Sequence, residues 1–418
     1  MSKSRPRGER LDMAAPAATQ EPSLAVRPRP APFFLRRRFL RQFMPVASLA
    51  VVGLVALLVS ANLLLPFERL VTLEGAGGSK AKFLDDQQVR ELLLRHHIRV
   101  QVTRLGSRGA AADLDSLDFI FSSGQPAAEL VTQQRREAGK YASAKRPFVS
   151  PIVLATYRDY AETLRAAGIS SPQATPGFDQ PYYYDLDVGR FLALVRAQRT
   201  WDDLDIRAQG FTNGNTVLAQ TTNVCGSNSA ATYLGLVSYL TRGGVPTTEQ
   251  DAANLAAEIK PLLRSQGLPV GLAPADLYFV PEGRQIAPII VLYEHQYLAH
   301  QLRHRDRFDE LDGDRVLLYP STGLQTEPTL VALNEAADRL GGLLSTDDGL
   351  RRRALELGFR VLDPNLESSS EQLPRFLAGQ GVPEPSTAAS DTRALLPDTP
   401  LLETMISVVG DCPPGVPE

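Results

Sequence analysis

The feature that most constrains this chain is an apolar stretch near its beginning. Residues 44–66 contain no Asp, Glu, Lys or Arg. At a rise of about 1.5 Å per residue, a helix of this length covers the ~30 Å hydrocarbon core of a bilayer. The stretch is apolar all round, so no amphipathic soluble pattern competes with this interpretation. Residues 43–67 therefore predict one transmembrane helix.

The charges before this stretch predict its orientation. Residues 1–41 hold ten Lys and Arg against three Asp and Glu, and four of the arginines lie within residues 36–41. The positive-inside rule then places residues 1–42 in the cytoplasm, as a disordered basic tail rich in Pro and Arg. We expect a single-pass protein of the cell inner (plasma) membrane, with a periplasmic or extracellular body.

A cleaved signal peptide is the alternative to a permanent anchor. Val59, Ser60 and Ala61 form a passable small-residue cleavage site. The basic leader is more than 40 residues long, well beyond an ordinary signal peptide, which favours an uncleaved signal anchor.

Composition excludes several classes of protein. The 418 residues are 43% hydrophobic and 22% charged, which is ordinary globular usage. A net charge of −3 argues against a nucleic-acid binder. Two cysteines are too few for a cysteine-rich zinc module, and outside the cytoplasm Cys225 and Cys412 either form a disulfide or stay separate.

The body alternates strands and helices. Its first part predicts strands at 70–73, 98–103, 117–121 and 148–156, with helices at 85–97, capped by Asp85, and at 126–138. Its second part predicts strands at 216–220, 287–293 and 315–319, with helices at 188–198, 230–240, 251–263, 294–303, 329–341 and 346–357. Such alternation indicates α/β architecture, with parallel sheets covered by helices on both faces.

Four of the expected strands are followed by polar loops. These loops hold Gly77-Gly78-Ser79, Ser122-Ser123-Gly124-Gln125, Gly226-Ser227-Asn228-Ser229 and Tyr293-Glu294. In open parallel sheets, ligands bind beyond the carboxyl ends of strands, and free N–H groups at helix starts hold anions. The same residue types are ordinary turn and cap residues, so each loop alone fits either a ligand site or a structural turn.

These loops and their flanking strands carry a family resemblance. Residues 117–131, 221–240, 287–299 and 315–360 resemble the type II periplasmic solute-binding proteins, nearest to the molybdate- and sulfate-binding branch. The resemblance covers roughly residues 69–363. It implies two doubly wound α/β lobes joined by a hinge, within residues 68–364. Chain order then assigns 69–150 and 310–363 to lobe one and 155–305 to lobe two, followed by an irregular Pro/Ser-rich segment with a short terminal helix at 365–418.

The resemblance also implies which residues face a solute. Carried over by position, Ser79, Ser122 and Ser123 would face the cleft from lobe one, and Ser227, Asn228, Ser229 and Tyr293 from lobe two. Glu294 departs from an anion-binding pattern, because a carboxylate repels an anion. If Glu294 points into the cleft, a cationic solute is favoured; otherwise it stabilises the start of the following helix.

Enzymatic alternatives have weaker support in the sequence. His300 and His304 are four residues apart, a zinc-compatible spacing that Asp309 or Glu310 would have to complete. The pair Asp202-Asp203 beside Trp201 fits a turn better than sugar chemistry. No nucleophile elbow, Walker loop or dinucleotide fingerprint is present. We therefore expect no enzyme, no cofactor and no metal.

The sequence thus predicts a membrane-anchored solute-binding protein for a small polar or anionic solute. Its expected partners are that solute and a membrane permease or signalling protein, with no nucleic acid. Two alternatives stay open: a tethered scaffold or sensor without a ligand, and a metal-dependent hydrolase.

Overall fold

The computed structural model describes residues 43–53, 69–104, 114–264, 274–362, 371–386 and 392–412. The chain divides into two compact units, Met1–Glu68 and Arg69–Glu418. In the first unit, residues 43–53 form a helix. Most of the expected transmembrane segment, residues 54–67, lies outside the described residues. Within the described residues, no helix combines the length and the apolar character that crossing a membrane requires.

The second unit contains two mixed sheets. The first has the order β2-β1-β3-β12-β4, with bounds Ile98–Arg104, Val71–Gly77, Phe119–Ser122, Thr329–Ala332 and Ser143–Lys145. Strands β1, β2 and β3 are parallel, whereas β12 runs antiparallel to β3 and β4. Helices α2 (Lys82–Asp85), α3 (Gln87–Arg95), α4 (Gln125–Glu137) and α12 (Glu335–Thr346) pack on it, and α13 (Asp348–Glu356) packs on α3 and α12. This sheet with its helices is called the first lobe.

The second sheet is built around the long strand β5. Its main path runs β8-β5-β9-β7-β6, with bounds Ile289–Tyr293, Phe148–Tyr157, Arg315–Pro320, Tyr183–Leu186 and Ser170–Pro172. Strand β5 is antiparallel to β8 and β9. Because β12 is also antiparallel to its neighbours in the first sheet, the expectation of parallel sheets is wrong for both sheets. The associated helices are α5 (Arg158–Ala166), α6 (Val188–Arg196), α7 (Asn228–Arg242), α8 (Glu249–Arg264), α9 (Pro274–Tyr278), α10 (Gly283–Ile286) and α11 (Glu294–Phe308). This sheet with its helices is called the second lobe.

Three crossings join the lobes within the described part of residues 69–362. The chain passes from β4 to β5, and it returns from β11 (Gln325–Thr326), which pairs with β5, to β12. After α13 it crosses once more, because β13 (Arg360–Val361) pairs with β5. Strand β9 lies in the second sheet, although the expected boundaries assign it to lobe one. The return crossing therefore falls after residue 326.

Two expected elements differ because of packing. Gly77, expected in a loop, is the last residue of β1, which pairs with β2 and β3. Gly75 lies in the same strand, where a Cβ would be 2.2 Å from Cζ of Phe119. The helix expected at 329–341 begins only at Glu335. Residues Thr329–Ala332 are fully buried and complete the first sheet as β12, and Asn334 caps the helix that follows.

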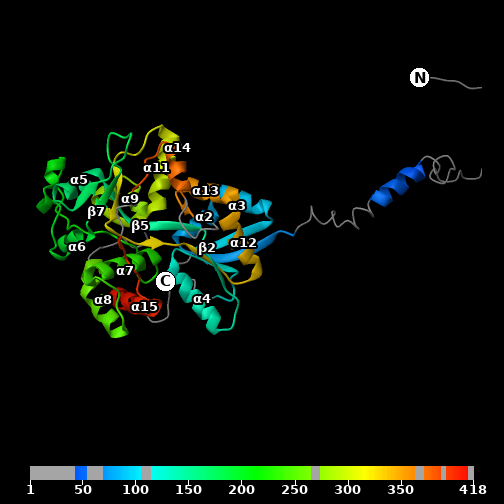
Figure 1. The fold of residues 1–418 in the computed structure, drawn as a ribbon, viewed down its shortest axis with the longest axis horizontal. Helices are drawn as coiled ribbons and strands as arrows, with labels where there is room; N and C mark the ends of the chain where they lie inside the picture. Colours follow the sequence, from blue (N-terminus) through cyan, green and yellow to red (C-terminus); the bar gives the residue numbers. More distant parts are fainter. Residues whose placement is uncertain are drawn as a thin grey trace, which may run out of the picture. The chain divides into compact units, whose positions relative to one another are not determined.

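The last described segment packs against both lobes. Helix α14 (Gln372–Gly379), missed in the sequence, contacts α13 and β13 (Arg360–Val361), and β14 (Thr392–Arg393) pairs with β10 (Thr322–Gly323). Helix α15 (Thr399–Gly410) packs on α7 and α8 and also touches α4 of the first lobe (Figure 1). Residues 392–412 are called the C-terminal strap.

Candidate functional site

The site expected from the sequence lies where the two lobes meet, and its loops are in direct contact. Gly124 follows β3 in the first lobe, and Asn228 begins α7 in the second. A Cβ at Gly124 would lie 2.5 Å from Nδ2 of Asn228. Asn228 also donates to the hydroxyl of Tyr293 at 3.4 Å. The structure therefore brings the end of β3 against Asn228 and Tyr293.

Three hydroxyls form a closed cluster beside Asn228. The Thr222 hydroxyl donates to Ser227 Oγ at 2.6 Å and lies 2.9 Å from Ser229 Oγ, while Ser227 and Ser229 lie 2.9 Å apart. Ser229 also bonds to the hydroxyl of Tyr293. Burial raises the pKa of Tyr293, so its hydroxyl stays protonated. This cluster offers uncharged donors and acceptors.

The serines expected in the first lobe are placed differently from one another. Ser122 is fully buried, and its hydroxyl donates to the carbonyl oxygens of Gly124 at 2.9 Å and Thr329 at 3.2 Å. It thus links β3 to β12 within the first lobe. Ser123 is 2% exposed at the start of the loop that meets Asn228. Ser79 begins the short helix η3 (Ser79–Ala81) after β1.

Lys80 occupies the junction, and sequence reasoning missed it. Its Nζ donates to Thr326 Oγ1 at 2.5 Å and lies 3.7 Å from the centroid of the Tyr293 ring. Lys80 is 1% exposed, and burial holds its pKa well below the usual range. Among the described residues, no carboxylate pairs with it. The available signal was its place directly after Ser79, in a chain that uses Arg far more often than Lys.

Glu294 does not join the other expected site residues. Both of its oxygens accept from Arg360, at 2.7 and 2.8 Å, and Oε1 also accepts from the hydroxyl of Tyr319 at 2.7 Å. Glu294 is fully buried. The expectation that its carboxylate faces a solute is thus not supported, because the buried guanidinium of Arg360 holds it.

A cavity of about 350 Å³ adjoins the junction. It lies between α2 of the first lobe and α9 and α11 of the second, and Lys80 and His295 form part of its wall. His295 is held by Ser150, whose Oγ lies 2.9 Å from Nδ1, and it stacks on Phe359 with ring centroids 4.0 Å apart. Burial and the nearby Lys80 and Lys82 lower the pKa of His295 well below its usual value, which keeps it neutral.

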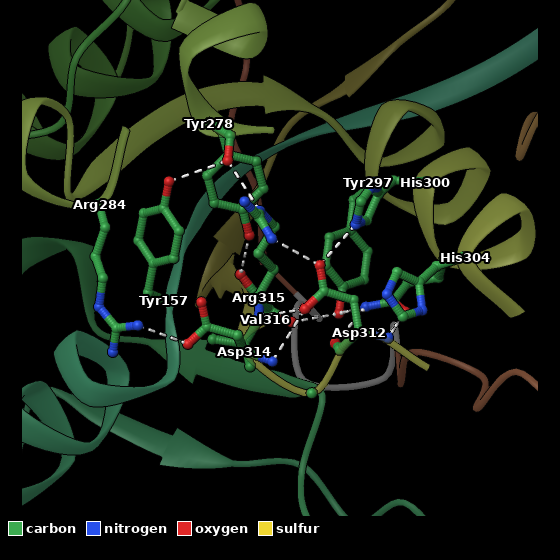
Figure 2. Close-up of polar contacts among 12 residues, drawn as sticks. Tyr157, Tyr278, Arg284, Tyr297, His300, His304, Asp312, Asp314, Arg315 and Val316 are labelled. Carbon is green, nitrogen blue, oxygen red and sulfur yellow. Dashed lines mark hydrogen bonds and ion pairs between the residues drawn. The ribbon is translucent and has the colours of Figure 1, made fainter. Parts of the chain in front are cut away.

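The histidines at 300 and 304 belong to a different network (Figure 2). His300 Nε2 lies 2.7 Å from Asp312 Oδ2, which also accepts from Arg315 at 2.8 Å. Burial alone would raise the pKa of Asp312, but the hydrogen bonds of His300 and Arg315 outweigh it and hold that pKa well below its usual range. His304 bonds to the backbone carbonyl of Glu310. No group of three potential metal ligands occurs among the described residues.

Two further expectations concern residues outside the junction. Asp202 and Asp203 accept from the backbone N–H groups of Asn213 and Thr200, which makes 200–205 a structural turn. Cys225 and Cys412 are joined by a disulfide across 187 residues of sequence. The disulfide ties the C-terminal strap to the loop that carries Thr222 and Ser227.

Solved structures similar to this chain include solute-binding proteins. The iron-bound HitA of Pseudomonas aeruginosa shares 10% identity over 82% of this chain and 99% of that one, with a TM-score of 0.47. The sulfate-binding protein SubI of Mycobacterium tuberculosis shares 15% over 75% and 92%, with a TM-score of 0.39. An ABC transporter solute-binding protein of Thermotoga lettingae, bound with α-D-tagatose, shares 11% over 81% and 93%, with a TM-score of 0.45.

These likenesses carry no argument about the ligand, because their TM-scores lie below 0.5 and their identities are 15% or lower. No protein-family model matches the sequence, and no curated protein matches it either. The function is therefore argued from the junction itself.

Proposed function

We propose that the chain is an extracytoplasmic solute-binding protein that holds a small polar or anionic solute between its two lobes. The observation that carries this proposal is the convergence of polar groups from both lobes at one place. Lys80 and the loop at Gly124 come from the first lobe, and Asn228, Ser229 and Tyr293 come from the second. Hydroxyl, amide and ammonium groups are the donors that hold polar and anionic solutes.

Lobe motion supplies the entry route in this proposal. The described junction is closed, since Lys80, Asn228 and Tyr293 are each at most 2% exposed. Three crossings, β4 to β5, β11 to β12 and α13 to β13, connect the lobes within the described part of residues 69–362. Rotation about such crossings opens the junction, and a bound solute favours the closed form.

The proposal includes the anchor. Residues 43–67 would hold the protein in the inner membrane with residues 1–42 in the cytoplasm, as the charge pattern predicts. A permanent anchor would keep the lobes near a membrane permease or a signalling partner. No catalytic group is proposed.

One observation favours a second candidate, a tethered scaffold or sensor that has no ligand. The side chains of Lys80, Asn228 and Tyr293 are buried at the junction. Lys80 donates to Thr326 and Asn228 donates to Tyr293, so these groups have protein partners without a solute. In such a protein the lobe surfaces would serve partner contacts.

Thermal unfolding of the full-length protein in mild detergent separates the two candidates. The ligand panel contains oxyanions, amino acids, polyamines and neutral sugars. A ligand of the native state stabilises it by RT ln(1 + [L]/Kd), roughly 2.7 kcal/mol at a hundredfold excess over Kd. A rise in Tm with one class, lost in Asn228→Ala, supports solute binding. A flat response to every class favours the scaffold.

A further inference from the structure

The cavity beside the junction has an unusual set of charges. Lys80, Lys82 and Arg303 all line it. Lys80 is buried, whereas Lys82 and Arg303 are exposed at its rim. None of the three forms an ion pair with a described residue. The cavity therefore presents three basic side chains, one of them taken out of water.

One of the carboxylates near the cavity is held by another residue. Asp86 lies in the wall, but both of its oxygens accept from Arg353, at 2.7 and 2.9 Å. Asp276 and Asp85 also line it, the first exposed and the second half-buried. Burial of an ammonium group without a counter-ion is costly, and it lowers the pKa of Lys80. An anion placed beside Lys80 favours its protonated form.

The remaining wall is aromatic. Phe83 and Phe359 are 2% and 3% exposed, and Phe279 is half-buried. The ring of His295, stacked on Phe359, continues this surface with its Nδ1 already held by Ser150. Its Nε2 has no partner among the described residues. The wall thus combines flat apolar faces with one neutral imidazole near Lys80.

We propose that this cavity binds an organic anion with one phosphate, sulfonate or carboxylate group on a flat apolar body. The anionic group lies against Lys80 and His295, and the body packs among Phe83, Phe279 and Phe359. The volume of about 350 Å³ suits a ligand of one ring. The cavity shares Lys80 with the junction but not Asn228, Ser229 or Tyr293, so this inference adds a neighbouring site to the one in the proposed function.

Isothermal titration calorimetry on the full-length protein tests this class. The probes are phenyl phosphate, inorganic phosphate, phenol and benzylamine. We expect phenyl phosphate to bind at least tenfold more tightly than inorganic phosphate, and the other two to give no heat. If benzylamine or phenol bound as tightly as phenyl phosphate, the proposal that the cavity selects an anion would be overturned.

Two variants assign the binding to this cavity. Lys80→Met keeps the buried stem but removes the charge, and we expect it to weaken phenyl phosphate at least tenfold. Arg303→Met, at the exposed rim, should weaken it severalfold and guards against a folding defect in the first variant. The control Lys140→Met removes an exposed lysine paired with Asp115 and should change nothing. Unchanged affinity in both Lys80→Met and Arg303→Met would refute the site.

Failure of this inference differs from failure of the proposed function. If phenyl phosphate does not bind but a neutral sugar or an amino acid raises Tm, the solute-binding function stands and the anion is wrong. If no member of the calorimetric set or of the thermal panel binds, both are wrong.

Discussion

Lys80 has a cost to stability that depends on pH. Burial lowers the pKa of Lys80 in the folded protein, so the unfolded chain binds more protons between that lowered pKa and about 10.4. The buried lysine therefore lowers the unfolding free energy most at pH values below its folded pKa. This loss becomes smaller as pH rises towards about 10.4. We expect Lys80→Met to raise the unfolding free energy at pH 7 by about 1–3 kcal/mol.

The measurement is urea unfolding at several pH values from 7 to 10. The gain over the wild type should shrink as pH rises, whereas Lys140→Met should track the wild type throughout. A gain that is constant with pH would show that packing, and not the buried charge, explains the effect.

Glu294 and Arg360 form a buried ion pair whose members depend on each other. Removing one partner leaves an uncompensated buried charge, which costs about 3–5 kcal/mol. We expect Glu294→Gln to lower the unfolding free energy by that amount, and Glu294→Gln with Arg360→Met to recover much of it. The matched control is Glu371→Gln, since Glu371 is 80% exposed in its pair with Arg375 and such pairs contribute about 0–1 kcal/mol. If Glu294→Gln and Glu371→Gln lowered the unfolding free energy equally, the role of the buried pair would be contradicted.

At the scale of elements, the disulfide holds α15 to the site loop. Cys225 lies in the loop before α7, and Cys412 follows α15. We expect reduction, or Cys412→Ser, to cost about 2–4 kcal/mol. Amide hydrogen exchange should then speed up in both residues 221–227 and α15.

A control separates the disulfide from the reductant. In the variant Cys225→Ser with Cys412→Ser, added reductant should leave the exchange rates unchanged. If reduction of the wild type accelerates exchange in α15 alone, the strap does not order the loop.

Elements with local signals were predictable, and elements defined by distant partners were not. The helix predicted at 188–198 is observed as α6, Val188–Arg196, and Asp187 caps it by accepting from the N–H of Arg190. The cap of α3 is Asp86 instead of Asp85, one residue later, because it bonds to the N–H groups of Gln88 and Val89. Strand β12 had no local signal, since its short apolar run continues into a helix and only pairing with β3 and β4 makes it a strand.

The same limit applies to the site. The polar loops at strand ends were identified from the sequence, and the structure brings Asn228, Ser229 and Tyr293 together. The direction of Glu294 depends on Arg360, 66 residues later, and the burial of Lys80 depends on Tyr293 and Thr326. No pattern within a short stretch of sequence carries such information.

At the scale of the whole molecule, the contact between Gly124 and Asn228 sets how closely the lobes approach. Gly124 has an extended backbone, with φ at −178°, that any residue adopts. A side chain there therefore acts only through the 2.5 Å clash with Asn228. We expect Gly124→Val to open the junction and to weaken solute binding at least tenfold.

Small-angle X-ray scattering measures this opening as an increase in the radius of gyration. The control is Gly342→Val, because a Cβ at Gly342 meets nothing within 4 Å. Identical scattering from both variants would show that the lobes do not move at this contact.

The strap also has a consequence for the order in which the protein is made. The first sheet needs β12, about 200 residues after β3, and the second lobe is completed by α15 and by Cys412, 187 residues after its partner. Neither lobe can close its core while only the first half of the chain has been synthesised. The first sheet can be completed once β12 has been synthesised, whereas the second lobe is complete only after residue 412 has emerged. A nascent chain therefore presents unpaired sheet edges that require protection until those partners arrive.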